Sequence, residues 1–256
     1  MIEVKNLCKS FEEKLVLNDI DAVFETGKVN MIIGQSGSGK TVMLKCVVGL
    51  LMPNDGKVLY DGRNLLTMNK KEINSLHREQ GMLFQASALF DSMTVLENVL
   101  FPLIMFSPEK KKMQLTRAKD CIERVNLKEA ENLYPSELSG GMQKRVAIAR
   151  SIALKPKYLF CDEPNSGLDP KTSLIIDELI QNITQEYGMT TVVNTHDMNS
   201  VMGIGDHIIF INQGKKDWEG TKDGIFTASN DNLNKFVFAS NLFKDVKSTH
   251  LNNIEG

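Results

Sequence analysis

The sequence feature that most constrains the fold is a glycine-rich stretch, GQSGSGKT, at residues 34–41. It matches the phosphate-binding pattern GxxxxGK[ST], and it lies between the apolar run VNMII and a segment with helical spacing. The glycines allow backbone N–H groups to curl around phosphate oxygens, and the N-terminus of the next helix favours negative charge. An ordinary glycine-rich turn is the alternative, but both flanking elements favour a nucleotide-phosphate site.

Each residue of this loop has an expected role if ATP and Mg²⁺ are the ligands. Lys40 is expected to reach the β- and γ-phosphates, and the Thr41 hydroxyl is expected to bind Mg²⁺. The rest of the loop is expected to surround the phosphates, and it consists of Gly34, Gln35, Ser36, Gly37, Ser38 and Gly39.

The order of strand and helix patterns predicts an α/β fold. Residues 2–24 alternate as in a half-buried antiparallel sheet, whereas VNMII is a solid apolar run, as in a strand buried on both faces. From about residue 86 to 155, three segments have helical spacing and no strand pattern separates them. Strand patterns return in KYLFCD, TTVVNTH and HIIFINQGKKDWEG, which predicts a helical insertion within an α/β core.

Composition excludes several classes of protein. The formal net charge is −2 and no long basic run is present, so the electrostatic signature of a nucleic-acid-binding protein is missing. The four cysteines are scattered without a CxxC pair, which fits a reducing, cytosolic compartment and no cysteine metal site. The N-terminus resembles no signal peptide, and apolar runs such as FPLIMF are too short to cross a membrane.

Two acidic residues end an apolar strand pattern, YLFCDEP, in the second half of the chain. Asp162 and Glu163 would lie at the carboxyl edge of the sheet, where ligands bind in folds of this kind. Asp162 suits the Mg²⁺ shell, and Glu163 suits the polarisation of an attacking water molecule. The alternative, that both acids cap the following helix, is less favoured because of the phosphate loop upstream.

Two further polar residues follow apolar runs. His196 ends VVNTH and Gln85 ends GMLFQ. Taken alone, the histidine is more often structural and the glutamine could be an exposed loop residue.

Taken in order, these motifs resemble the ATP-binding cassette (ABC) transporter ATPases. Gln85, LSGGMQ at 138–143 and SGLD at 166–169 stand in the family's order around the acidic strand, and the resemblance runs from residue 2 to 225 or so. LSGGMQ is its most specific part. The resemblance implies an ATPase with a P-loop NTPase (RecA-like) core, an N-terminal antiparallel β subdomain and an inserted α-helical subdomain.

In this family two cassettes pack head to tail, and each ATP lies between the P-loop of one copy and the signature of the other. The resemblance therefore implies a homodimer in which Ser139, Gly140 and Gly141 contact the partner's nucleotide. Ser139 can also cap a helix, but a simple cap does not explain two glycines, each of which costs a helix up to ~1 kcal/mol.

The resemblance also implies roles for single residues. Glu163 would be the catalytic base, His196 would hold the γ-phosphate, and Gln85 would contact Mg²⁺ or the water. Asp169 would contact the partner's P-loop, and Phe11 would stack on adenine, unless it is simply a core or edge aromatic. Asn165 stands where many relatives carry threonine, a departure that replaces no catalytic group.

The family pattern divides the single ABC ATPase domain, 1–256, into parts. We expect a nucleotide-binding core at 1–85 and 156–227, a helical insertion at 86–155 and a C-terminal tail at 228–256. In the family, a short permease helix enters a groove between core and insertion, and residues 86–106 are apolar enough to line it or to form the insertion's own core. The amphipathic tail segment LNKFVFASNLF could contact a partner or pack on its own core.

The segments GMLFQASALFDSMTVLENVLFPL and DEPNSGLDP are most similar to the ATPases of the Mla (Mce-type) phospholipid transport systems. The resemblance implies peripheral attachment to the cytoplasmic face of the inner membrane, with permease subunits, and it suggests an Mce-domain protein and a small regulatory subunit. The roughly 30 residues after the cassette are too few for the regulatory domain of many methionine importers. Two alternatives stay open: an ATPase for amino acids, lipoproteins or other small solutes, and a soluble cluster-assembly ATPase.

Overall fold

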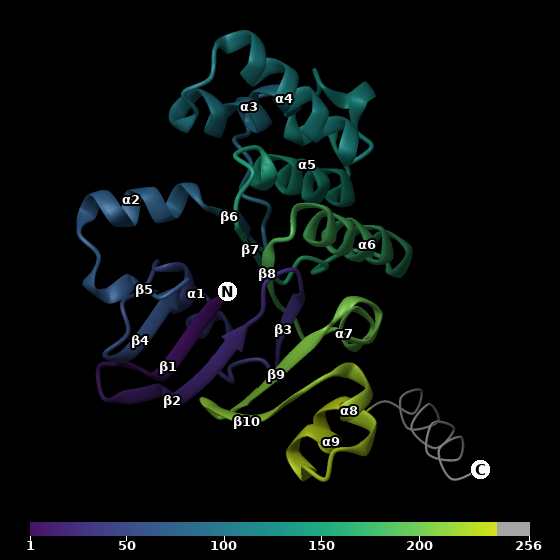
Figure 1. The fold of residues 1–256 in the computed structure, drawn as a ribbon. Helices are drawn as coiled ribbons and strands as arrows, with labels where there is room; N and C mark the ends of the chain where they lie inside the picture. The colour runs from purple at the N-terminus through teal and green to yellow at the C-terminus, as the bar shows by residue number, and fades with distance from the viewer. Residues whose placement is uncertain (240–256) are drawn as a thin grey trace. The chain divides into compact units, whose positions relative to one another are not determined.

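A computed structural model of the chain describes residues 1–239, which form two compact units (Figure 1). The first unit comprises Met1–Leu66 and the chain from Asn194 onward, and the second comprises Thr67–Val193. Both units combine strands and helices, so the predicted α/β class is confirmed.

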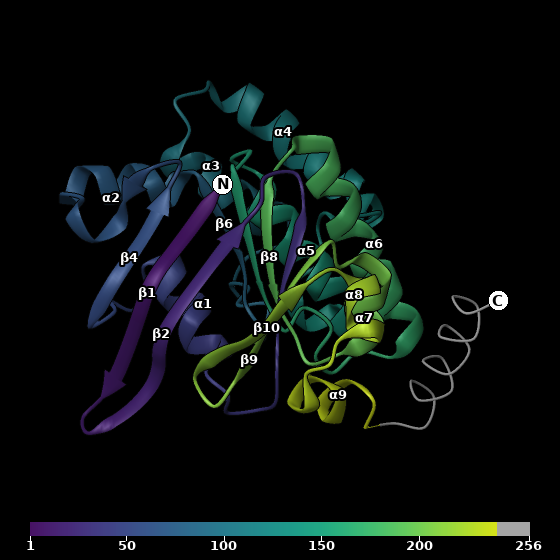
Figure 2. The ribbon, with the colours of Figure 1, turned by 60° about the horizontal axis from the view of Figure 1, so that its bottom comes forward.

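The first unit contains an antiparallel sheet with the strand order β2-β1-β4-β5. Alternate residues at the start of β1, including Ile2 and Val4, are fully buried, as the period of two predicts. Figure 2 shows β2, β1 and β4 side by side. The strands are β1 (Ile2–Phe11), β2 (Lys14–Phe24), β4 (Asp55–Tyr60) and β5 (Arg63–Asn64).

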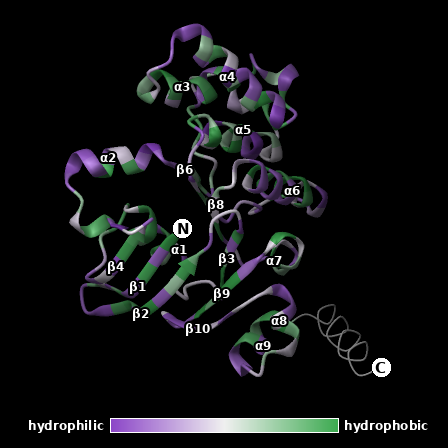
Figure 3. Cartoon of the chain, in the orientation of Figure 1, coloured by the Kyte–Doolittle hydropathy of each residue, from purple (hydrophilic) through white to green (hydrophobic). Residues whose placement is uncertain are grey.

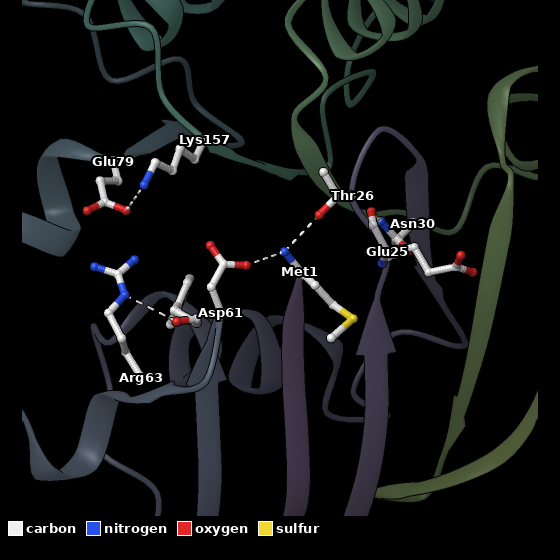
Figure 4. Close-up of polar contacts among 9 residues, drawn as sticks. Met1, Glu25, Thr26, Asn30, Asp61, Arg63, Glu79 and Lys157 are labelled. Carbon is white, nitrogen blue, oxygen red and sulfur yellow. Dashed lines mark hydrogen bonds and ion pairs between the residues drawn. The ribbon is translucent and has the colours of Figure 1, made fainter.

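Polar contacts join neighbouring strands at one end of this sheet. The amine of Met1 donates to Thr26 Oγ1 and to Asp61 Oδ1, each at 2.7 Å (Figure 4). These bonds join the start of β1 to the residues after β2 and to the turn between β4 and β5.

The other strands of the first unit carry the phosphate loop. All five residues of β3 (Val29–Ile33) are buried, and β3 pairs in parallel with β9 (His207–Asn212), which pairs antiparallel with β10 (Lys215–Gly220). The solid apolar run therefore predicted a buried strand correctly. The helices are α1 (Lys40–Val48), α7 (Met198–Ile204), α8 (Lys222–Thr227) and α9 (Asp231–Val237).

The described part of the expected tail packs on its own unit. Leu233 and Val237 of α9 are buried, and the Phe236 ring stacks on Phe210 of β9 with 5.4 Å between centroids. The remainder of the tail segment, from residue 240, lies outside the described residues.

The second unit contains three neighbouring strands in the order β8-β7-β6. β6 (Gln80–Leu83) and β7 (Tyr158–Asp162) are parallel, and β8 (Thr190–Asn194) reaches the boundary between the units. Its helices are α2 (Lys70–Arg78), α3 (Val95–Phe106), α4 (Lys111–Arg124), α5 (Gly140–Ile152) and α6 (Pro170–Tyr187). Short 3-10 turns lie at Leu65–Thr67, Lys128–Ala130 and Pro135–Glu137.

Helix α2 is an element that the apolar pattern did not predict. It is largely hydrophilic (Figure 3), and Leu76 is its one buried residue. Its start is nevertheless encoded by a capping box, in which the Asn69 side chain accepts from backbone N–H groups and Glu72 accepts from the Asn69 N–H. After α2 an ion pair of 3.3 Å joins Glu79 to Lys157, before β7 (Figure 4).

Helix α3 resolves the two alternatives for residues 86–106. Val95, Val99 and Leu103 are buried in the core that α3 shares with α4 and α5, whereas Ile104 and Met105 are exposed. Part of the segment is therefore core, and part is surface. Within residues 1–239, no helix is both long enough and apolar enough to span a bilayer.

Candidate nucleotide-binding and catalytic site

The phosphate loop of the first unit is wound around its own lysine. Lys40 Nζ donates to the main-chain oxygens of Gly34, at 2.9 Å, and Gln35, at 3.0 Å, and its side chain is almost fully buried. Gly34 has a φ of 150°, and a Cβ there would lie 2.2 Å from the Ile211 oxygen. The loop can therefore have this shape only with glycine at position 34.

Two hydroxyl groups of the loop suit a phosphate and its metal ion. Ser38 Oγ is buried and has no hydrogen-bond partner among the described residues. Such an atom is costly unless a ligand supplies the partner, and a phosphate oxygen would do so. Thr41 Oγ1 accepts from the Asn194 side chain at 3.1 Å, and a hydroxyl oxygen of this kind is a ligand that suits a hard cation.

His196 and Phe11 belong to the same unit as the phosphate loop. His196 is exposed two residues after Asn194, whose side chain contacts Thr41. Phe11 ends β1 with 43% of its surface exposed, and Lys9 Nζ lies 5.2 Å from its ring centroid. Phe11 is therefore not a core aromatic, and an exposed ring is what stacking on adenine requires.

The acidic strand lies in the second unit. All five residues of β7 are buried, including Asp162 at its end, and Glu163 follows with a φ of 49°. A non-glycine residue in the left-handed region is uncommon, and such backbones gather at functional sites. Its neighbour Asn165 donates to Asp177 at 2.8 Å, so this side chain braces the loop against α6.

Gln85 and Glu163 are brought together by a residue that the motifs did not indicate. The buried ammonium group of Lys144, on α5, donates to the main-chain oxygens of Gln85 and Glu163. Gln85 Nε2 also donates to Ser166 Oγ at 3.2 Å. Burial lowers the pKa of Lys144, and the nearby Asp162 and Glu163 carboxylates oppose that shift.

The segment after Gln85 is held by two further residues that sequence reasoning missed. Arg150 donates to the oxygens of Ser87, at 2.8 Å, and Ala88, at 2.7 Å, and both residues have positive φ. The Asn98 amide of α3 donates to the oxygens of Phe90, Met93 and Thr94. All these acceptors are main-chain oxygens, which no sequence pattern marks.

The signature turn opens α5 as predicted, but its two glycines differ. Ser139 is the N-cap and accepts from the Met142 N–H at 3.3 Å. A Cβ on Gly141 would lie 2.4 Å from Thr172 Cγ2, so packing against α6 requires this glycine. A Cβ on Gly140 would approach nothing closer than Leu168, at 3.7 Å. Packing within the chain therefore explains Gly141 and leaves Gly140 to be explained.

Asp169 opens α6 as its N-cap. Its carboxylate accepts from the Thr172 N–H at 3.0 Å and from the Thr172 hydroxyl at 2.5 Å. These bonds lower the pKa of Asp169, which is exposed. Thr172 thus touches Asp169 through its hydroxyl and approaches Gly141 through its methyl group.

A family model described as "ABC transporter" matches residues 17–166, which is more than half of the chain. The chain belongs to the ABC transporter ATP-binding cassettes. The resemblance read from the motifs is confirmed, and with it the assignment of the chain as the ATP-binding subunit of such a transporter.

Two kinds of ABC relatives are equally similar to this cassette. The methionine import ATP-binding protein MetN of Clostridium acetobutylicum is 36% identical over 237 residues, which cover 93% of this chain and 74% of MetN. The intermembrane phospholipid transport system ATP-binding protein MlaF of Haemophilus influenzae is 36% identical over 239 residues, which cover 93% of this chain and 90% of MlaF.

A solved ABC cassette confirms the fold class. The dimeric structure of MJ0796, a bacterial ABC transporter cassette, has a TM-score of 0.79 and 33% identity, and covers 87% of this chain and 99% of that chain. The same protein is also known in a post-hydrolysis state bound to ADP and Pi, with the same TM-score. Together with the family match, this neighbour confirms that the cassette is an ATPase.

The second unit of the cassette also carries an apolar groove of about 590 Å³. The aromatic residues of the groove come from the two ends of residues 84–106, the segment that follows β6. Arg150 also lines the groove. The apolar lining residues include Met82, Phe84, Ala88, Phe90, Phe101 and Phe106.

Proposed function

We propose that this cassette hydrolyses ATP at sites shared by two copies of the chain. The phosphate loop of one copy binds the triphosphate, and Ser139 and Gly140 of the other copy cover the γ-phosphate. Gly140 carries this proposal, because it is exposed and packing within its own chain does not require it. A self-complementary contact of this kind makes two sites at once.

The catalytic roles follow from the chemistry of the groups. Lys40 and Ser38 hold phosphate oxygens, and His196 holds the γ-phosphate. Glu163 accepts the proton of the attacking water, which Gln85 orients. Asp169 contacts the phosphate loop of the other copy, and Phe11 stacks on the adenine ring.

A magnesium ion is expected to be held by Thr41, Asp162 and Gln85, because hydroxyl, carboxylate and amide oxygens are its usual ligands. When bound, it would neutralise charge on the β- and γ-phosphates. Thr41 belongs to the first unit and the other two residues to the second. Within the described residues no three His, Cys, Asp or Glu side chains form a metal cluster, so the ion is expected to depend on the nucleotide for other ligands.

The substitution Glu163→Gln tests the shared site. We expect ATP turnover to fall by roughly 10²- to 10⁴-fold, the usual contribution of a general base. Because ATP then persists, light scattering should show the variant becoming a dimer in saturating MgATP. Glu178→Gln, on the exposed side of α6, is the matched control and should leave turnover unchanged. A Glu163→Gln chain that hydrolyses ATP normally, or remains monomeric, would contradict the proposal.

We further propose that the apolar groove receives a short helix of a membrane-spanning permease. Its aromatic lining and its volume, about 590 Å³, suit an amphipathic helix laid into a groove. The cassette would then lie on the cytoplasmic face of the inner membrane.

We infer that phospholipid is the transported substrate. In this proposal the permease would select the substrate, and the groove would select the permease. The segment that is similar to Mla-type ATPases, GMLFQASALFDSMTVLENVLFPL, supplies Phe84, Phe90 and Phe101 to the groove wall. The resemblance thus falls on the surface that would select the permease, and it implies an Mce-domain protein and a small regulatory subunit as further partners.

Methionine or another small solute is the second candidate, because MetN is as similar to this cassette as MlaF. Purification of the tagged chain from its native membranes in mild detergent, followed by mass spectrometry of proteins and lipids, separates the two. Recovery of an Mce-domain protein and bound phospholipid would support phospholipid transport. Recovery of an amino-acid permease without either would contradict it, and recovery of a soluble complex alone would favour a cluster-assembly ATPase.

A further inference from the structure

Three apolar side chains that are more than half exposed lie where α3 ends and α4 begins. Ile104 is 61% exposed, Met105 is 56% exposed and Met113 is 57% exposed. Single exposed apolar residues are common, whereas apolar residues gathered on one surface mark an interaction site. These residues, with Lys110, Lys111 and Lys112, are called the α3–α4 corner below.

The corner is a fixed surface. The buried Gln114 amide, next to Met113, donates to the oxygens of Leu103, at 3.1 Å, and Ser107, at 3.3 Å. An ion pair between Arg117 and Glu109 holds the intervening loop against α4. The first turn of α4 is therefore bound to the last turn of α3, which fixes the position of Met113 relative to the end of α3.

Three consecutive lysines complete this surface. Lys110, Lys111 and Lys112 are exposed, and in the described part of the chain no ion pair includes them. The nearest acidic residue in sequence, Glu109, is already paired with Arg117. The positive charge of the corner is thus uncompensated by its own acidic neighbour.

These lysines do not serve the helix that they begin. Lys110 is the N-cap of α4 without a side-chain hydrogen bond, and the first turn contains no acidic residue. Positive charge at the N-terminus of a helix opposes the helix dipole. The three lysines are therefore placed unfavourably for α4. Stabilisation of the fold does not explain their position.

We propose that the α3–α4 corner binds directly to the surface of an anionic phospholipid bilayer. Apolar side chains that enter the headgroup region, together with adjacent lysines, are the two contributions that stable attachment to such a surface requires. A protein partner fits less well, because the cores of protein interfaces are depleted of lysine. Long lysine side chains also keep their charge in water while their stems cover apolar surface.

The corner is continuous with the apolar groove. Phe106, which lines the groove, follows Met105 directly, and the Arg78 guanidinium carbon lies 5.7 Å from the Phe106 ring centroid. A membrane-embedded partner in the groove would bring the corner towards the bilayer. The inference goes beyond the proposed function and stands without it, because the test contains no permease.

Vesicle flotation of the purified full chain tests the proposal. The probes are vesicles of phosphatidylcholine alone and vesicles that also contain phosphatidylglycerol. The wild-type chain should float with the anionic vesicles, and added salt should weaken binding by screening. The variant Lys110→Gln/Lys111→Gln/Lys112→Gln should bind roughly 100-fold more weakly, because three contacts with an anionic surface are lost.

The control variant Lys14→Gln/Lys57→Gln/Lys215→Gln changes net charge equally but removes exposed lysines elsewhere, and it should bind as the wild type does. Ile104→Ser/Met105→Ser/Met113→Ser should weaken binding by roughly tenfold or more, because apolar contact area is lost. Circular dichroism establishes that each variant is folded.

Two results would overturn the proposal. Either the wild-type chain fails to bind anionic vesicles, or the control variant loses as much binding as the lysine variant of the corner. If the chain does not bind vesicles but an acidic protein binds the α3–α4 corner, the corner is a protein interface instead.

Discussion

The ammonium nitrogen of Lys144 lies 3.5 Å from the main-chain oxygen of Glu163, and it also donates to the main-chain oxygen of Gln85. One side chain of α5 thus holds two loops that carry proposed catalytic groups. Glu163 has a left-handed backbone, and a bond to its oxygen helps to hold that backbone conformation. We regard Lys144 as a positioning residue.

Replacement of Lys144 tests this relationship. Lys144→Met keeps the length of the side chain and removes the donor, so we expect kcat to fall by roughly 10²-fold, as for a misplaced catalytic group. The affinity for ATP should change little, since the phosphate loop lies in the other unit. Lys144→Arg should restore part of the lost kcat, which a purely structural role would not predict.

Lys128→Met is the matched control, because Lys128 is exposed and, among residues 1–239, its ammonium group pairs with Glu123 alone, at 3.5 Å. Steady-state kinetics on all three variants measure kcat, and ATP titrations measure the affinity for ATP separately. Equal losses of kcat and ATP affinity in Lys144→Met would show that the lysine acts on the fold as a whole.

Gly141→Ala should destabilise the cassette through one identified contact. The new Cβ would lie 2.4 Å from Thr172 Cγ2, and overpacking of this kind costs about 1–3 kcal/mol. Thr172→Ser removes that methyl group and keeps the hydroxyl that binds Asp169, so it should restore stability in the double variant. Urea unfolding measures both; a double variant no more stable than Gly141→Ala would contradict this contact.

Gly140→Ala, in contrast, should stabilise the fold but weaken the function of the cassette. A helical glycine without close neighbours gains stability when replaced by alanine, by about 0.5–1 kcal/mol. If a second copy approaches this backbone, however, ATP-driven dimerisation and hydrolysis should decrease. The same unfolding series, with light scattering in MgATP, checks both effects; normal dimerisation would place the partner contact elsewhere.

Asp169 gives a pH dependence with a definite sign. Its folded pKa is lowered by the Thr172 hydroxyl and N–H, so ionised Asp169 stabilises the fold above the ordinary aspartate pKa. This stabilisation is lost as the pH falls through the lowered value. Thermal unfolding should therefore show Asp169→Asn as less stable than wild type at neutral pH, with the gap closing in acid. Thr172→Val should narrow the neutral-pH gap; a gap independent of pH would contradict the assignment.

Alkylation should separate the four cysteines. Burial raises the pKa of Cys161 to about 12, and that of Cys46 and Cys121 to about 11, so these thiols form little thiolate near neutral pH. Cys8 is only partly buried and should be labelled first by iodoacetamide in the folded chain. Peptide mass spectrometry measures the order, and labelling in denaturant is the control. Labelling of Cys161 as fast as Cys8 would mean that β7 opens readily.

The sequence predicts those features that depend on neighbouring residues. The phosphate loop is a local backbone shape set by Gly34 and its neighbours, and it lies between a strand and a helix as expected. The caps at Ser139 and Asp169 are equally local, because each side chain binds an N–H three residues on.

Contacts between distant segments could not be predicted in the same way. Lys144 and Arg150 bind main-chain oxygens 59 to 63 residues away, and every residue has such an oxygen. From the sequence, contact with the partner's nucleotide was the explanation for both signature glycines. In the structure, packing on Thr172 accounts for Gly141. Helix α2 escaped prediction because an apolar pattern cannot mark a helix with a single buried residue.

The two bonds of Arg150 have a consequence for how the segment after Gln85 can move. The oxygens of Ser87 and Ala88 bind the same guanidinium group, and both residues have left-handed backbones. A rearrangement that moves both residues away from Arg150 would have to break two bonds to the same side chain. We therefore expect the residues between Gln85 and Phe90 to move as a unit, because one guanidinium group holds both oxygens.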